Sequence, residues 1–111
     1  MHISWEVTAS DNEWRDEPPA ERAVVILDGV LDYAGAIELR ARLTCTIAWS
    51  TGDLVLDLRD VTAIDPTAVS VFVRAHRELA DEGRRLWLRS PGDDVCRVLD
   101  RTGASGTIPI E

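Results

Sequence analysis

The segment from Asp65 to Ala68 contains the side chains best placed for recognition or modification. Asp65 precedes Pro66, and Thr67 follows within the first turn of a helix that the downstream sequence predicts. Aspartate caps helix N-termini, and proline suits the first helical position because its missing N–H would have no partner there. The same helix end has unpaired N–H groups and partial positive charge, which favour an anion or a phosphorylated hydroxyl. Two interpretations therefore stand: a structural cap, and a recognition or phosphorylation site.

No set of catalytic or metal-ligating residues accompanies this segment in the sequence. His2 and His76 are not at ligand spacing, and His76 falls in an apolar helical stripe, where a neutral, hydrogen-bonded histidine is expected. Cys45 and Cys96 form no CxxC pair, which favours two separate thiols, with a redox input through them as the alternative. GxGxxG, P-loop and GxSxG motifs are also missing. We therefore expect a binding module, not an enzyme, without cofactor or metal.

Chain length and charge further limit the kinds of protein and partner that are expected. The chain has 111 residues, 45% of them hydrophobic and 29% charged, which predicts one soluble globular domain over residues 1–111. Twenty acidic residues against twelve basic ones, all arginine, give a formal charge of -8. This balance opposes binding to nucleic acid or an anionic membrane and suits a basic protein partner better. Without a membrane-spanning run or a signal peptide pattern, the expected location is cytoplasmic.

Strand and helix patterns alternate along the chain and must position the Asp65 segment. Strands are predicted over residues 3–8, 23–27, 54–58, 86–88 and 108–110, and helices over residues 36–49, 66–82 and from Asp93 or Asp94 to Gly103. The resulting order, β-β-α-β-α-β-α-β, predicts an α/β domain with right-handed crossovers, a mostly parallel or mixed sheet, and helices mainly on one face.

Residues 9–22 separate the first two predicted strands. They are acidic, polar and interrupted by two prolines, which predicts a long loop; Trp14 in its middle either folds back onto the domain or forms an exposed contact. The loop is either a solvated linker or an acidic segment that steers an arginine-rich partner.

Three parts of the chain resemble STAS domains, the family of anti-sigma factor antagonists. The run VVILDGVLD at residues 24–32, followed by ELR, resembles the family's V-x-L-x-G-x-L-D…E-L-R segment. Residues 54–65 are similar to its hydrophobic strand, V-T-x-I-D connection and phosphorylation loop, and residues 90–103 resemble its S-P…D-x-x-G pattern. Together these matches span residues 23–110 in the family's order and imply the STAS fold.

The resemblance implies a small cytoplasmic module of a partner-switching system. Unphosphorylated members bind an anti-sigma factor, often a serine kinase, and phosphorylation of a Ser or Thr just after the loop aspartate breaks the complex. By position, Asp65 matches that aspartate and Asp32 matches the acid before the first helix. A phosphate of about -2 charge at such an interface would act through repulsion and desolvation.

The chain departs from the family at the acceptor position. Where the family has D-S-S-G or D-S-T-G, this chain has DPTA, so Pro66 occupies the acceptor slot without a hydroxyl. Thr67 is a misplaced substitute, turned about 100° around the helix, and Ser70 is a poorer one. We therefore expect no switching by standard phosphorylation. The predicted partner-binding residues are Asp32, Asp65, Pro66, Thr67, Val69 and Ser70.

The sequence is also compatible with a second role that STAS domains have. STAS accessory subunits that dock on the ATPase of a lipid-transport complex share the fold and need not be phosphorylated. The sequence does not identify the partner or the oligomeric state.

Overall fold

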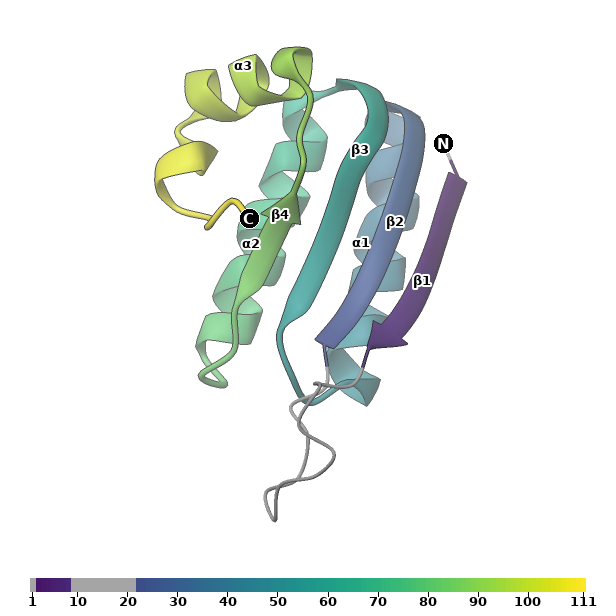
Figure 1. Ribbon diagram of the computed structural model, residues 1–111, viewed down its shortest axis with the longest axis vertical. Coiled ribbons are helices and arrows are strands. Elements are labelled where there is room, and N and C mark those ends of the chain that lie inside the picture. The colour runs from purple at the N-terminus through teal and green to yellow at the C-terminus, as the bar shows by residue number, and fades with distance from the viewer. Residues whose placement is uncertain (1, 9–21) are drawn as a thin grey trace.

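The computed structural model describes residues 2–8 and 22–111. Its elements, in chain order, are β1 His2–Thr8, β2 Arg22–Leu31, α1 Tyr33–Trp49, β3 Leu54–Ile64, α2 Pro66–Ala80, β4 Leu86–Arg89, α3 Asp93–Thr102 and a 3-10 turn, Ala104–Gly106. The four strands form one sheet in the order β1-β2-β3-β4 (Figure 1). β1 runs antiparallel to β2, whereas β2, β3 and β4 are parallel. The predicted mixed α/β sheet is confirmed.

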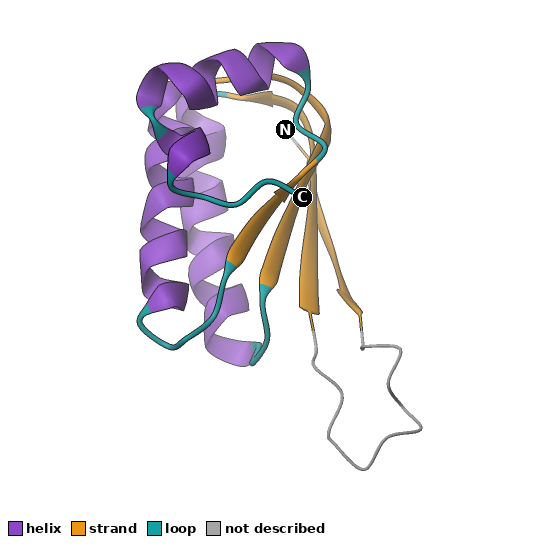
Figure 2. Ribbon diagram, turned by 60° about the vertical axis from the view of Figure 1, so that its left-hand side comes forward, coloured by secondary structure: helices purple, strands orange, loops and turns teal. Residues whose placement is uncertain are grey.

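α1 and α2 lie side by side on one face of the sheet, and α3 crosses the end of the sheet beside α2 (Figure 2). Period-two alternation directs one side of each parallel strand toward them, and this side supplies Leu27, Leu56 and Leu88, each fully buried. The helices contribute Leu39 from α1 and Phe72 from α2 to the same cluster. Most of the hydrophobic core therefore lies between the sheet and one layer of helices, as the sequence predicted.

β2, β3 and α1 extend clearly beyond the ranges that the sequence predicted. β2 continues to Leu31 and β3 to Ile64, and these two residues pair in the parallel register. α1 begins at Tyr33, three residues before the predicted start, because the Asp32 carboxylate accepts a 2.8 Å hydrogen bond from the N–H of Gly35. α2 is slightly shorter than the predicted range 66–82: it stops at Ala80, just before the turn that contains Gly83.

Two predictions at the C-terminal end are wrong. The N-cap of α3 is Gly92; Asp93 and Asp94 follow it in the first turn, where their charge complements the helix dipole without a capping hydrogen bond. The strand predicted over residues 108–110 is reduced to a single bridge between Leu88 and Ile110. Pro109 has no N–H to continue a ladder, although its carbonyl accepts from the N–H of Leu88.

The predicted loop over residues 9–22 and Trp14 lie outside the described residues, except for Arg22, which begins β2. Both cysteines are free: Cys45 is exposed on α1, and Cys96 is half-buried on α3. His76 is half-buried on α2, and its Nδ1 has no hydrogen-bond partner among the described residues. The hydrogen bond expected for this histidine is therefore not formed at Nδ1.

A buried arginine, which the sequence did not single out, joins the loops at the end of α1. Arg84 is 9% exposed, and its guanidinium donates to the carbonyls of Gly52 (2.8 Å) and Ile47 (3.1 Å) and to the hydroxyl of Ser50 (2.6 Å). It also pairs with Glu82 at 2.7 Å. A cation suits this position because the C-terminal end of a helix carries partial negative charge.

Candidate partner-binding site

Asp65 forms the corner between β3 and α2. Its carboxylate accepts a 2.8 Å hydrogen bond from the N–H of Thr67, and its carbonyl accepts from the N–H of Ala68. Its own N–H donates to the carbonyl of Leu31 at the end of β2. The predicted cap is confirmed. Hydrogen bonding from Thr67, first through its backbone N–H and then through its side chain, lowers the pKa of Asp65.

Asp32 forms the corresponding corner between β2 and α1. Because Leu31 and Ile64 pair side by side in parallel strands, the two corners lie at the same end of the sheet. The structure therefore brings Asp32 and Asp65, 33 positions apart in the sequence, to neighbouring helix starts. Both carboxylates are engaged in capping, which fixes the two helix ends that they hold.

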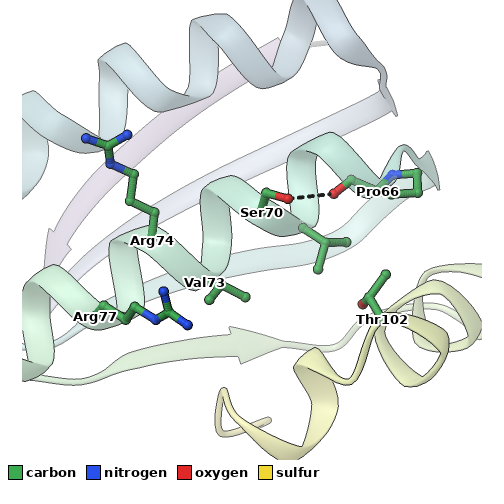
Figure 3. Close-up of a pocket in the computed structure, with 7 residues that line it drawn as sticks. Pro66, Ser70, Val73, Arg74, Arg77 and Thr102 are labelled. Atoms are coloured by element: carbon green, nitrogen blue, oxygen red, sulfur yellow. Dashed lines mark hydrogen bonds between the residues drawn. The ribbon is translucent and has the colours of Figure 1, made fainter.

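A groove separates α2 from α3. It has a volume of about 610 Å³ and is lined by Pro66, Val69, Ser70, Val73, Arg74, Arg77 and Thr102. We call it the α2–α3 groove. Figure 3 shows Pro66 and Ser70 on α2 on one side and Thr102 on α3 on the other.

A smaller depression, of about 240 Å³, lies between the first halves of α1 and α2. It is lined by Tyr33, Ala36, Ile37, Arg40, Thr67, Ser70, Val71 and Arg74. We call it the α1–α2 cleft. Ser70 and Arg74 line both depressions, so the outward side of α2 forms the ridge between them.

The predicted residues of α2 occupy different sides of this ridge. Pro66 is exposed and faces the α2–α3 groove, whereas Thr67 is half-buried and faces the α1–α2 cleft. Ser70 is exposed, and its hydroxyl donates to the Pro66 carbonyl at 3.3 Å. Val69 is only 2% exposed and belongs to the hydrophobic core, so it can contribute no more than the floor of the groove.

Sequence reasoning missed the apolar residues that α1 places beside this ridge. Tyr33 is 63% exposed and Ile37 is 56% exposed, and both line the α1–α2 cleft. Large apolar side chains exposed together at one end of a small domain indicate a contact surface. Reading Asp32 as an N-cap would have started the helix at Tyr33 and placed Tyr33 and Ile37 four residues apart on one face.

The stability of the fold should decrease at low pH, partly because Asp65 becomes protonated. Because the folded pKa is lowered, the ionised carboxylate stabilises the fold above about pH 4, and this contribution is lost as the pH falls below that value. Asp65→Asn retains a capping oxygen without titrating. We expect it to unfold at nearly the wild-type temperature near neutral pH and to lose less stability than the wild type at about pH 3.

Asp65→Ala is the comparison that removes the cap itself. Its unfolding temperature should be lower by about 4 °C even at neutral pH. Thermal unfolding followed by circular dichroism at several pH values measures both variants. The assignment to Asp65 fails if the Asn variant and the wild type lose stability equally in acid.

The described part of the chain shows no group of three or more His, Cys, Asp or Glu side chains arranged to hold a metal ion. Among its helices, none has the length and apolar character that crossing a membrane requires. The candidate site consists of two depressions, an arginine-bearing ridge and exposed apolar side chains.

Comparisons of the sequence with family models and with known proteins agree on one family. The STAS domain model matches residues 15–111. The chain is 28% identical over 110 residues to the anti-sigma-B factor antagonist of Bacillus subtilis, covering 99% of this chain and 92% of that protein.

Solved structures agree in fold. The unphosphorylated anti-sigma factor antagonist SpoIIAA superposes with a TM-score of 0.72 at 18% identity, covering 97% of this chain and 88% of that one. An anti-sigma factor antagonist from Mycobacterium paratuberculosis gives a TM-score of 0.73 at 22% identity, covering 96% and 85%. Since the family model spans most of the sequence and the fold agrees over nearly its whole length, the chain belongs to the STAS domain family.

Proposed function

We propose that this protein is an anti-sigma factor antagonist: a cytoplasmic, non-enzymatic module that regulates transcription by binding an anti-sigma factor. The contact surface is the outward side of α2 together with the start of α1. The observation that carries the proposal is the pairing of two capped helix starts, which places exposed Pro66, Ser70, Tyr33 and Ile37 around two adjoining depressions. The similarity to the anti-sigma-B factor antagonist of Bacillus subtilis supports the same function.

Binding at this surface needs little rearrangement of the protein. The Asp32 and Asp65 caps hold both helix starts, and Phe72 on α2 is fully buried in the core. A preorganised surface spends less of its interaction free energy on ordering side chains and loops. Asp32 and Asp65 therefore serve as positioning residues, while Pro66, Ser70 and the exposed side chains of α1 touch the partner.

Regulation by standard phosphorylation is excluded from this proposal because Pro66 has no hydroxyl. Thr67, the next residue, is half-buried and faces the α1–α2 cleft, whereas Pro66 faces the α2–α3 groove. A kinase that docks to phosphorylate the Pro66 position would therefore find no acceptor in line with its phosphate donor. The antagonist is either constitutively active or controlled through another input.

Binding is tested by titrating the full chain against anti-sigma factors of its source organism in a calorimeter. We expect one of them to bind, and Tyr33→Ala to weaken the complex about tenfold because exposed aromatic side chains are frequent anchors of interfaces. Trp49→Ala is the matched control, since Trp49 is 48% exposed at the opposite end of α1. Binding to no anti-sigma factor, with sigma-dependent transcription unchanged by the protein, would refute the proposal.

Phosphorylation is tested by incubating the chain with the kinase partner and ATP and measuring its intact mass. The wild-type chain should gain no phosphate, whereas Pro66→Ser, which places a hydroxyl in the acceptor slot, should gain one. A phosphate mapped to Thr67 in the wild-type chain would contradict the proposed regulation.

The missing hydroxyl also favours a second candidate, an accessory subunit of a lipid-transport complex, because this role does not require phosphorylation. Such a subunit would copurify with an ATPase instead of an anti-sigma factor. Affinity purification from the source organism followed by mass spectrometry separates these two functions.

A further inference from the structure

The charge beside α2 is opposite to the charge of the whole protein. The chain carries a formal charge of -8, yet neither the α2–α3 groove nor the α1–α2 cleft is lined by an aspartate or glutamate. Arg74 and Arg77 line the groove, and Arg40 and Arg74 line the cleft. The charged side chains that line these two depressions are therefore all arginines.

These arginines are available to a ligand. Figure 3 shows Arg77 extending along the groove beside Val73, whereas Arg74 extends toward α1. Within residues 22–111, Arg77 and Arg40 have no ion pair, and Arg74 pairs only with half-buried Glu78, with 3.2 Å between Nε and Oε1. A solvent-accessible pair at this helical spacing is weak, so a carboxylate from another molecule can compete with Glu78.

The rest of the groove is apolar or offers no free donor. Val69, Val73 and Pro66 supply its apolar surface. The hydroxyl of Ser70 donates to the Pro66 carbonyl and that of Thr102 donates to the Val98 carbonyl at 2.8 Å, so both protons are already used within their own helices. The guanidinium groups are the strongest donors that remain, and planar guanidinium pairs well with carboxylate.

We infer that the α2–α3 groove binds a segment of the partner protein in which apolar side chains are flanked by aspartate or glutamate. This inference rests on the proposed function, because it assigns the chemistry of the partner at the same surface. The net charge alone favours a basic partner, but charges separated by more than about 10 Å are largely screened at ordinary salt, so contacts in the groove respond to its own arginines. Nucleic acid requires an extended basic face, whereas the groove and the cleft together are lined by only three arginines.

The test uses three synthetic peptides of equal length, each with a central Leu-Phe pair flanked by Glu, Gln or Lys. Each peptide is titrated into the full ¹⁵N-labelled chain at low salt. We expect the Glu peptide to bind about tenfold more tightly than the Lys peptide, to weaken as salt is raised, and to shift the amide signals of Ser70, Arg77 and Thr102.

Two charge-reversal variants test whether Arg77 in the groove causes the preference for the Glu peptide. Arg77→Glu should weaken the Glu peptide about tenfold and strengthen the Lys peptide. Arg97→Glu changes the net charge equally, but Arg97 lies on α3 outside the groove and pairs with Asp94, so it should change the affinity less than about twofold. Thermal unfolding of both variants verifies that they are folded.

Equal affinity for the Glu and Lys peptides, no binding of the Glu peptide, or shifts confined to another surface would overturn the inference. Binding of the groove to a second copy of this chain, seen as a concentration-dependent mass in sedimentation, would also overturn it. An anti-sigma factor that binds normally to Arg77→Glu would reject the inference while leaving the proposed function standing. If the peptides bind as expected but no anti-sigma factor binds the protein, the proposed function is rejected and the chemistry assigned to the groove stands.

Discussion

Arg84→Met should lower the free energy of unfolding by roughly 3 kcal/mol, because it removes a buried cation that holds several elements together. The guanidinium satisfies the carbonyls of Ile47 and Gly52 and the hydroxyl of Ser50, all near the point where α1 ends and β3 begins. Methionine keeps much of the side-chain volume but donates no hydrogen bond, so these oxygens would be left without their charged donor.

Chemical unfolding followed by fluorescence measures this loss, with Arg85→Met as the control. Arg85 is exposed and lies 6.0 Å from the ring centroid of Trp87, a contact worth about 1 kcal/mol or less at an exposed site. Losses of equal size in the two variants would show that the hydrogen bonds of Arg84 contribute no more than a surface contact does.

Phe72→Ala should destabilise the protein by roughly 3–5 kcal/mol, the range for truncating a fully buried phenylalanine. Phe72 is 0% exposed and points from α2 into the core shared with the sheet. Its loss would leave a cavity beneath the helix that carries the proposed contact surface, so partner binding should weaken as well. Phe72→Leu, which refills part of the volume, should lose distinctly less.

The control for Phe72 lies on the opposite side of the same helix. Ser70→Ala removes an exposed hydroxyl and should change stability by no more than about 0.5 kcal/mol. Urea unfolding of the three variants, together with titration of the partner, separates the stability effect from the binding effect. A Phe72→Ala protein as stable as Ser70→Ala would mean that α2 is not held by this core.

Local signals explain why the order of elements was predictable. The Asp-Pro pair at positions 65 and 66 fixed the start of α2, and Gly103, with φ of 80°, ends α3 as predicted. The ends of β2 and β3 were not predictable in the same way, because they depend on the pairing of Leu31 with Ile64 across the sheet. Arg84 was missed because the oxygens that it binds lie 32–37 residues earlier in the sequence.

The candidate site also has features that adjacent residues predict and features that depend on how the helices pack. The cap at Asp65, the exposure of Pro66 and Ser70, and the missing hydroxyl follow from a few adjacent residues. The participation of Tyr33 and Arg40 does not, because α1 must first pack beside α2 before these side chains can share a cleft with Thr67. A hydrophobic pattern identifies the buried face of each helix, but not which exposed faces become neighbours.

The identity of residue 66 has a genetic consequence. Every proline codon becomes a serine codon through one pyrimidine substitution at its first base, so a single point mutation in the gene would introduce a hydroxyl at the first position of α2. The Asp65 carboxylate would still accept from the N–H of Thr67, and serine is tolerated at an exposed helix start. On the regulation proposed above, a lineage carrying this protein is therefore one heritable step away from gaining phosphate control, without rebuilding the domain.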